Sequence, residues 1–284
     1  MTVLNHIRAA LAPLAVAALL LAAPPARAND DPDAHALSDA YLLEDLFAIM
    51  AEEGRANADT IRDDMLADRS TGAWDREIAR MYDPARMHAA FMADFADELA
   101  GQPDVTRAAL DFAGTEIGAR VLRLEIEARE AMLDDGIDAA ARDQARAARA
   151  DATELVGRVS ERIAANDLIE ANVSMGLNTS LAYFEGFSAT APRALRLSAD
   201  ALVPEVMAQE PEIRAEAEEW LYAYFLMAYA PLSEDEMRAY IEFSASAEGQ
   251  ALNTAMFNAF QVLYVDISRD LGRAIGEALS GMDL

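Results

Sequence analysis

Polar residues recur along one face of a helix predicted near the middle of the chain. Asn172, Thr179 and Tyr183 lie at intervals that place them on one side of that helix, and Glu170 lies near its start. Asparagine is a poor residue for a helix interior, so an amide there indicates a use beyond helix formation. We therefore expect Glu170, Asn172, Thr179 and Tyr183 to hold a ligand. Amides bonded within the core, together with close packing, would explain the same pattern without a ligand.

Carboxylates are the most abundant groups able to do acid–base chemistry, because the 284 residues include 50 Asp and Glu. A fold with so many acids brings some pair within the separation used by glycosidases. A hydrolase using paired carboxylates is therefore the alternative function, and it predicts a concave pocket with an acid of raised pKa near Glu170, Asn172 or Tyr183. No acidic cluster has EF-hand spacing, so we interpret the clusters as solvated helix ends and predict no metal site.

Other residue types that support catalysis are scarce. Outside the N-terminal leader there are two histidines, His35 and His88, and neither belongs to an HExxH or ExxH motif. The chain has no cysteine and no G-x-S-x-G motif, and all 23 basic residues are arginine. Thiolate metal sites, a nucleophile elbow and lysine Schiff bases are thereby excluded. We predict no catalytic residue, no metal ligand and no cofactor.

The charge balance excludes one class of partner. The formal net charge is −27, and a surface so anionic repels phosphate backbones, so we expect no nucleic-acid partner. Arg142, Arg146 and Arg149 form a basic stripe at helical spacing on this acidic chain. We expect the stripe to pair with acids of its own helix; a site for an anion or a partner is the alternative.

The first 28 residues have the three parts of a secretory signal peptide. Arg8 precedes a run of about 15 apolar residues, and small residues at Ala26 and Ala28 predict cleavage after Ala28. An uncleaved anchor is the alternative, but the run is shorter than the roughly 20 residues that span a bilayer. Cleavage removes two of the 23 arginines and no acid, so the net charge becomes 21 − 50 = −29. We expect a periplasmic protein with no transmembrane segment after cleavage.

The remaining sequence predicts helices almost throughout. After a polar, mobile lead at 29–37, alanine is abundant and β-branched runs are lacking, which favours helix over strand. We expect one all-α domain at 38–284. Apolar residues recur every three or four positions from Leu252 to Leu279, which predicts a long amphipathic C-terminal helix.

An internal repeat organises these predicted helices. An offset of 131 residues aligns 107–118 with 238–249. In each copy a phenylalanine ends one helix, a hydroxyl residue caps the next, and a glycine in its first turn allows close backbone approach. We predict two related helix-corner-helix units, at about 84–133 and 215–279. Their corner residues are Phe112, Thr115 and Gly118 in the first copy, and Phe243, Ser246 and Gly249 in the second.

At these residues the sequence resembles domain-of-unknown-function family 2059, a group of exported bacterial helical domains. The best match runs from Leu232 to Leu279 and includes the corner residues of the second unit. The sequence departs from the family pattern where Ser244 replaces the usual aromatic residue and Ala247 the usual proline. The resemblance implies an exported helical protein, and it supplies no catalytic residue.

These observations predict an exported, non-catalytic binding or interaction module. Its ligand would be an apolar peptide, a lipid-like molecule or an envelope protein held between helices, because the apolar content is large and catalytic motifs are lacking. The hydrolase is the alternative, and the sequence leaves the oligomeric state open.

Overall fold

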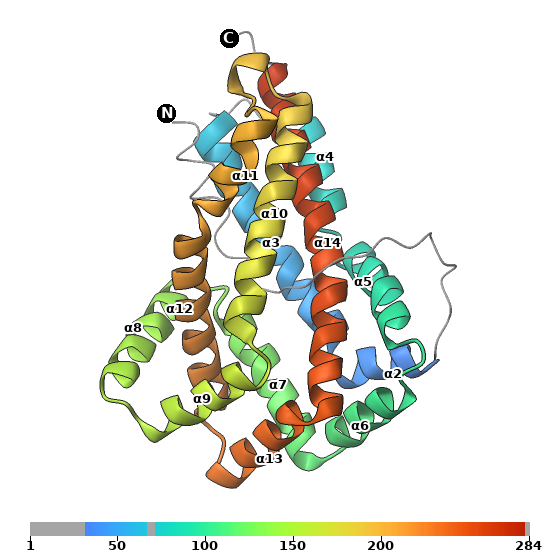
Figure 1. Ribbon diagram of the computed structural model, residues 1–284, viewed down its shortest axis with the longest axis vertical. Coiled ribbons are helices and arrows are strands. Elements are labelled where there is room, and N and C mark those ends of the chain that lie inside the picture. The colour runs from blue at the N-terminus through green and yellow to red at the C-terminus, as the bar shows by residue number, and fades with distance from the viewer. Residues whose placement is uncertain (1–31, 67–71, 282–284) are drawn as a thin grey trace.

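The chain folds into helices packed along one long axis (Figure 1). This computed structural model describes residues 32–66 and 72–281, and no strand occurs among them. The predicted all-α fold class is therefore confirmed. The predicted signal peptide, 1–28, lies outside the described residues.

Among the described residues, six helices lie before residue 132, and the others follow them. The first six are α2 (Pro32–Ala40), α3 (Leu43–Leu66), α4 (Gly72–Met81), α5 (Pro84–Leu99), α6 (Pro103–Ala113) and α7 (Glu116–Ala131). The rest are α8 (Asp135–Ala150), α9 (Glu154–Ala165), α10 (Leu168–Thr190), the short 3-10 helix η1 (Arg193–Leu195), α11 (Ala199–Met207), α12 (Glu210–Tyr229), α13 (Glu234–Ala245) and α14 (Ala247–Ser280).

The predicted mobile lead at 29–37 is wrong from residue 32 onward. Residues 32–40 form α2, in which Ala34 and Leu37 are buried in the main hydrophobic cluster. Ser38, one position later, is buried as well and bonds to His88 of α5. Ala34 and Leu37 thus pack α2 against the bundle. The polar composition of residues 29–37 does not predict this contact, because it depends on the tertiary structure.

Helices α10 and α14 lie side by side along the long axis and form the centre of the molecule (Figure 1). Glycines bring the two backbones together: a Cβ added to Gly186 would lie 2.0 Å from the carbonyl oxygen of Arg269, and one added to Gly272 would lie 2.1 Å from that of Tyr183. The predicted C-terminal helix is confirmed as the 34-residue α14. Its apolar stripe packs on α10, α5 and α6.

The two predicted corners have the same hydrogen bonds. Thr115 caps α7, where its Oγ1 accepts from the N–H of Gly118 at 2.9 Å. Ser246 caps α14, where its Oγ accepts from the N–H of Gly249 at 3.0 Å. A Cβ on either glycine would lie 2.0 Å from the carbonyl oxygen of the phenylalanine that ends the preceding helix. Both corners therefore require glycine for close approach of the backbone.

The corners also meet each other. The rings of Phe112 and Phe243 stack with centroids 4.2 Å apart and parallel planes. Around the corners, two kinds of helix contact each occur twice. Helix α5 packs on α14, and correspondingly α12 packs on α7. Helix α2 packs on α6, and correspondingly α9 packs on α13. The first pair of contacts follows the offset of 131 residues that aligns the two sequence copies, whereas α2 shifted by this offset falls on the end of α9 and the start of α10.

Candidate functional site

Three of the four predicted ligand residues are buried in helix packing. Asn172 is 3% exposed, and its amide nitrogen donates to the carbonyl of Leu168 in its own helix. Thr179 likewise bonds to the carbonyl of Met175, and Tyr183 is 1% exposed in the core. These polar groups therefore act within the packed core.

Glu170, the fourth predicted residue, lies elsewhere. Its side chain is exposed and pairs with Arg214 of α12, with 2.8 Å between Oε2 and Nη2. The structure thus does not bring the four residues to one opening. The hydrolase alternative loses support in its nominated region, because Asn172 and Tyr183 are buried and the exposed Glu170 is paired with Arg214.

A groove between α4, α5 and α14 offers a more accessible site. It has a volume of about 230 Å³ and lies where α5 packs on α14. Its lining combines apolar side chains with ionisable ones. They are Met81, Met87, Ala90, Val262, Leu263 and Ile267 on the apolar part, with Arg80, Arg86, Asp94, Asp266 and Asp270 around it.

Helical spacing explains why both kinds of side chain reach the groove. On α5, Met87, Ala90 and Asp94 follow one another at three and four residues, so they share one face. On α14, Asp266 and Asp270 lie one turn apart, beside the buried apolar stripe. Helix α5 therefore contributes an apolar edge and one acid to the opening, and α14 contributes an apolar edge and two acids.

Asp94 is the acid in the groove with unfavourable surroundings. Burial raises its pKa, and the neighbouring charges of Asp97, Asp266 and Glu98 raise it further. Among the described residues no arginine pairs with Asp94. The groove therefore holds a half-buried carboxylate without a cation, next to an apolar floor.

Among the other charges of the groove, Arg80, Asp266 and Asp270 have partners, whereas Arg86 has no carboxylate partner among the described residues. Arg80 donates to Asp270 at 2.9 Å and also pairs with Glu77 of its own helix. Asp266 accepts from Arg269 at 2.9 Å. These pairs leave Asp94 as the acid that a cationic ligand would stabilise most.

A second polar cluster lies under the corners, and it is largely buried: Arg162, Tyr229 and Tyr240 are buried and Glu125 is partly buried. Glu125 accepts from the hydroxyls of Tyr229 at 2.5 Å and Tyr240 at 2.8 Å. The Tyr240 oxygen in turn accepts from Nη2 of the buried Arg162 at 3.2 Å. The Arg162 guanidinium lies over the rings of Phe225 and Tyr240, which leave it little access to solvent. We assign this cluster to the core.

One serine–histidine contact also occurs. Ser38 Oγ lies 2.7 Å from His88 Nε2, and burial lowers the pKa of His88. Ser38 is 2% exposed within α2, so its hydroxyl cannot reach a substrate in solution. Among the described residues no three metal-binding side chains gather at one point. The groove at Asp94 is therefore the candidate site.

Sequence reasoning missed this groove for a physical reason. Asp94 and Asp266 lie far apart in the chain, and neither belongs to a motif. The available signal was a repeated acid beside an apolar stripe on both predicted helices, which a chain with 50 acids shows at many places.

Comparison of the chain with models of known protein families, with curated proteins and with solved structures finds no match. The resemblance to family 2059 thus stays a prediction, and the site rests on its geometry. In the part of the chain that the structure describes, no helix is both long and apolar enough to cross a membrane.

Proposed function

We propose that this protein is an exported, non-catalytic binding module that holds an amphipathic, cationic peptide segment in the groove at Asp94. The observation that carries the proposal is the half-buried carboxylate of Asp94, which has acids for neighbours and an apolar floor beside it. An unpaired buried charge is costly, and a ligand cation would remove that cost. Export is supported by the signal-like residues 1–28.

The lining of the groove favours one of the expected ligand classes. Met87, Val262 and Ile267 offer apolar contacts to leucine-like side chains, while Asp94 and Asp266 suit an ammonium or guanidinium group. An anionic lipid would meet repulsion from these same acids. A peptide or envelope-protein segment with alternating apolar and basic residues fits both features.

Calorimetric titration with a helical peptide of leucine and lysine tests the proposal. We expect the native chain to bind it, and Asp94→Asn to weaken binding about tenfold through loss of one partly desolvated ion pair. Asp111→Asn is the matched control, because Asp111 is exposed on α6, away from the groove. Equal affinity of the two variants, or equal binding of a peptide with glutamate in place of lysine, would contradict the proposal.

The paired-carboxylate hydrolase is the second candidate, and one observation favours it. The charge of Asp266 contributes to the raised pKa of Asp94, as expected for a general acid beside a carboxylate. A screen with chromogenic glycosides separates the two functions. Turnover that both Asp94→Asn and Asp266→Asn abolish would establish the hydrolase; peptide binding without turnover supports the module.

A further inference from the structure

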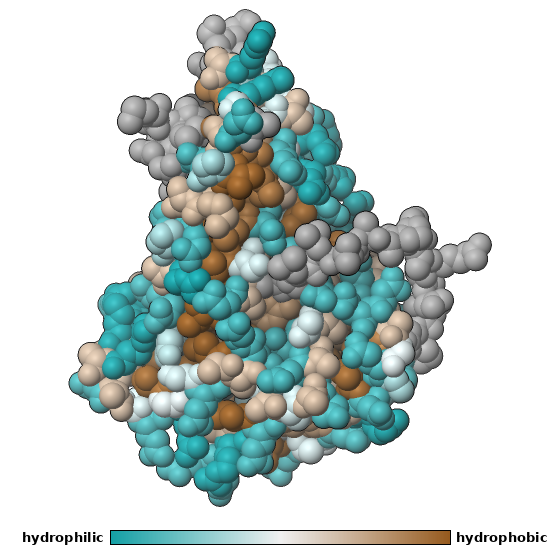
Figure 2. Space-filling model, viewed as in Figure 1, coloured by the Kyte–Doolittle hydropathy of each residue, from teal (hydrophilic) through white to brown (hydrophobic). Residues whose placement is uncertain are grey.

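Helix α11 leaves an apolar face at the surface. Its composition is as apolar as that of the buried central helix α10. Val203 and Met207 are nevertheless 56% and 53% exposed, and Pro204 between them is exposed too. Figure 2 shows apolar side chains gathered over α10 and α11. Contiguous apolar exposure of this kind marks a surface that interacts.

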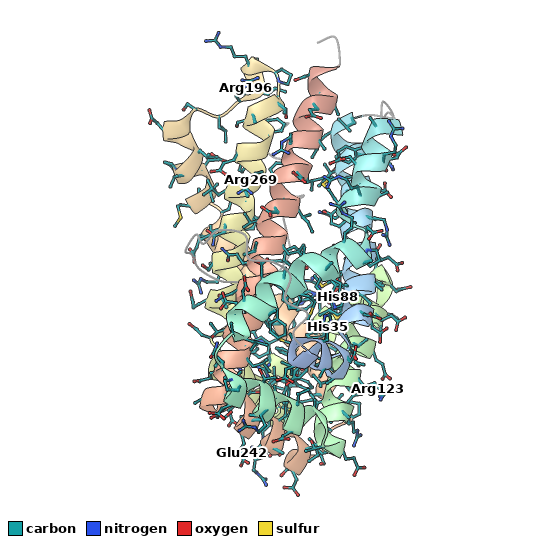
Figure 3. All side chains as sticks on the ribbon, turned by 90° about the vertical axis from the view of Figure 1, so that its right-hand side faces the viewer. His35, His88, Arg123, Arg196, Glu242 and Arg269 are labelled. Carbon is teal, nitrogen blue, oxygen red and sulfur yellow. The ribbon has the colours of Figure 1, made fainter. Side chains whose placement is uncertain are left out.

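The segment before α11 has an unusual charge pattern. Residues 186–199 contain no acid, in a chain that has 50, and carry Arg193 and Arg196. Both arginines are exposed, and no carboxylate of the described residues pairs with either. Arg196 donates from Nε to the carbonyl of Ala191 at 2.7 Å and projects from one end of the molecule (Figure 3).

Residues 192–207, which include η1 and α11, form a tip at one end of the long axis. Helices α10 and α14 both end there, and Ser280 Oγ donates to the carbonyl of Thr190 at 2.6 Å. With Asp200 and Glu205 of α11 counted, residues 186–207 carry two arginines and two acids and are neutral, whereas the whole chain carries −27. This stretch is therefore much less acidic than the chain as a whole, and the exposed Glu277 near the end of α14 is an acid at the same end.

We propose that this tip, residues 192–207, docks on a lipid bilayer with anionic headgroups. Arg193 and Arg196 would contact lipid phosphates, while Val203 and Met207 enter the boundary between headgroups and acyl chains. An end-on approach points the acidic body away from the membrane, and charges beyond about 8 Å are largely screened at physiological salt. A second copy of the chain is a poorer occupant, because two strongly anionic bodies repel each other.

Flotation with vesicles of phosphatidylglycerol and phosphatidylethanolamine in equal amounts tests this docking. We use the chain from residue 29 onward, which contains every helix that the structure describes, so that the apolar leader does not bind the vesicles. We expect the native chain to float and Val203→Glu with Met207→Glu to lower its partition at least about tenfold. Ile137→Glu is the matched control, because Ile137 is 41% exposed on α8 and its replacement should leave flotation unchanged.

The charge contribution is tested separately. Arg193→Gln with Arg196→Gln should weaken binding to these vesicles about tenfold and leave binding to phosphatidylcholine vesicles unchanged. Failure of the native chain to float, or equal flotation of the α11 variant and Ile137→Glu, would overturn the proposal. A dimer in sedimentation that the α11 variant dissociates, without flotation, would assign the tip to a second copy instead. Peptide binding at Asp94 should persist in all these variants, so the two proposals fail independently.

Discussion

At the scale of single residues, the groove is marked by a side chain that the fold does not satisfy. Asp94 is half-buried among Asp97, Glu98 and Asp266, although the chain carries 23 arginines that could have neutralised it. A neutral residue at position 94 would make the fold more stable, because it would bring no uncompensated charge into the groove. Functional sites keep such unfavourable charges at a cost in stability. Replacing Asp94 by a neutral residue should therefore raise the stability of the fold and weaken ligand binding, and both effects can be measured.

We expect Asp94→Asn to raise the thermal midpoint at about pH 7 by about 1–3 °C. The folded pKa of Asp94 is raised, so its ionised form destabilises the native state at neutral pH, and this cost fades as the pH falls through that pKa. The gain should therefore shrink on acidification, as followed by scanning calorimetry in a pH series. A lower midpoint for the variant at neutral pH would show that Asp94 is satisfied in the native state.

In the buried cluster under the corners, we expect the loss of a polar group to destabilise the fold. Tyr240→Phe removes the hydroxyl that accepts from Arg162 and donates to Glu125, and it leaves the guanidinium without that partner. We expect a loss of about 2–3 kcal/mol in the free energy of unfolding, measured in urea. Tyr222→Phe is the control: it breaks a 2.8 Å bond to Ser160 at a partly exposed position and should cost less than about 1 kcal/mol. Equal losses would show that burial does not strengthen the Tyr240 contacts.

At the scale of helices, two kinds of contact hold the molecule together. Helices α10 and α14 meet backbone to backbone through glycines, as described above. Helix α8 packs on α12 through small alanines and through ion pairs that join the predicted basic stripe to acids of α12. These pairs are Arg142–Glu216, Arg146–Glu219 and Arg149–Glu218. The stripe therefore pairs across helices as well as along its own helix, where Arg142 contacts Asp138.

The glycine contacts predict that one added methyl group destabilises the fold at Gly272 but not at a glycine with open space around it. Gly272→Ala places a Cβ about 2 Å from the backbone carbonyl of Tyr183, which cannot move without parting α10 from α14. We expect a loss of about 3 kcal/mol in the free energy of unfolding. Gly157→Ala on α9 is the matched control: nothing lies within 4 Å of its added Cβ, so helix propensity should stabilise it by about 0.5–1 kcal/mol. Similar effects of the two changes would contradict the close approach of α10 and α14.

At the scale of the whole molecule, charge opposes compactness. With a formal net charge of −27, the acidic groups repel one another and destabilise the folded state. Exposed ion pairs offset little of this repulsion. Added sodium chloride screens long-range repulsion more than it weakens partly buried pairs such as Arg129–Glu53. The folded chain should therefore become more stable as salt is added.

We expect the thermal midpoint to rise by about 2–5 °C between low salt and about 0.5 M sodium chloride. Scanning fluorimetry across a salt series measures this change. Arg129→Leu with Glu53→Leu, which removes a partly buried pair and no net charge, should show the same slope with salt. A falling midpoint would mean that ion pairs between helices outweigh the net repulsion.

Sequence patterns predicted the local features of this fold well. The caps at Thr115 and Ser246 and the stripe from Leu252 to Leu279 all follow from interactions within one or two helical turns. The ligand stripe at Asn172 did not lead to a site, because tertiary packing buries it: the amide nitrogen donates to the backbone of its own helix, and Oδ1 is enclosed without a partner among the described residues. Local periodicity places a side chain on a face but does not say what covers that face.

The sequence by itself determined the helical class, the helix ends and the excess of acid, since each depends on residue type and near neighbours. Only the tertiary structure decided that α2 is docked, that α10 packs along α14, and that Asp94 and Asp266 share a groove. It also left Val203 and Met207 outside the core, although their residue types suit an interior. Burial and pairing between distant segments arise from how helices cross, and periodicity along one helix contains no information about that crossing.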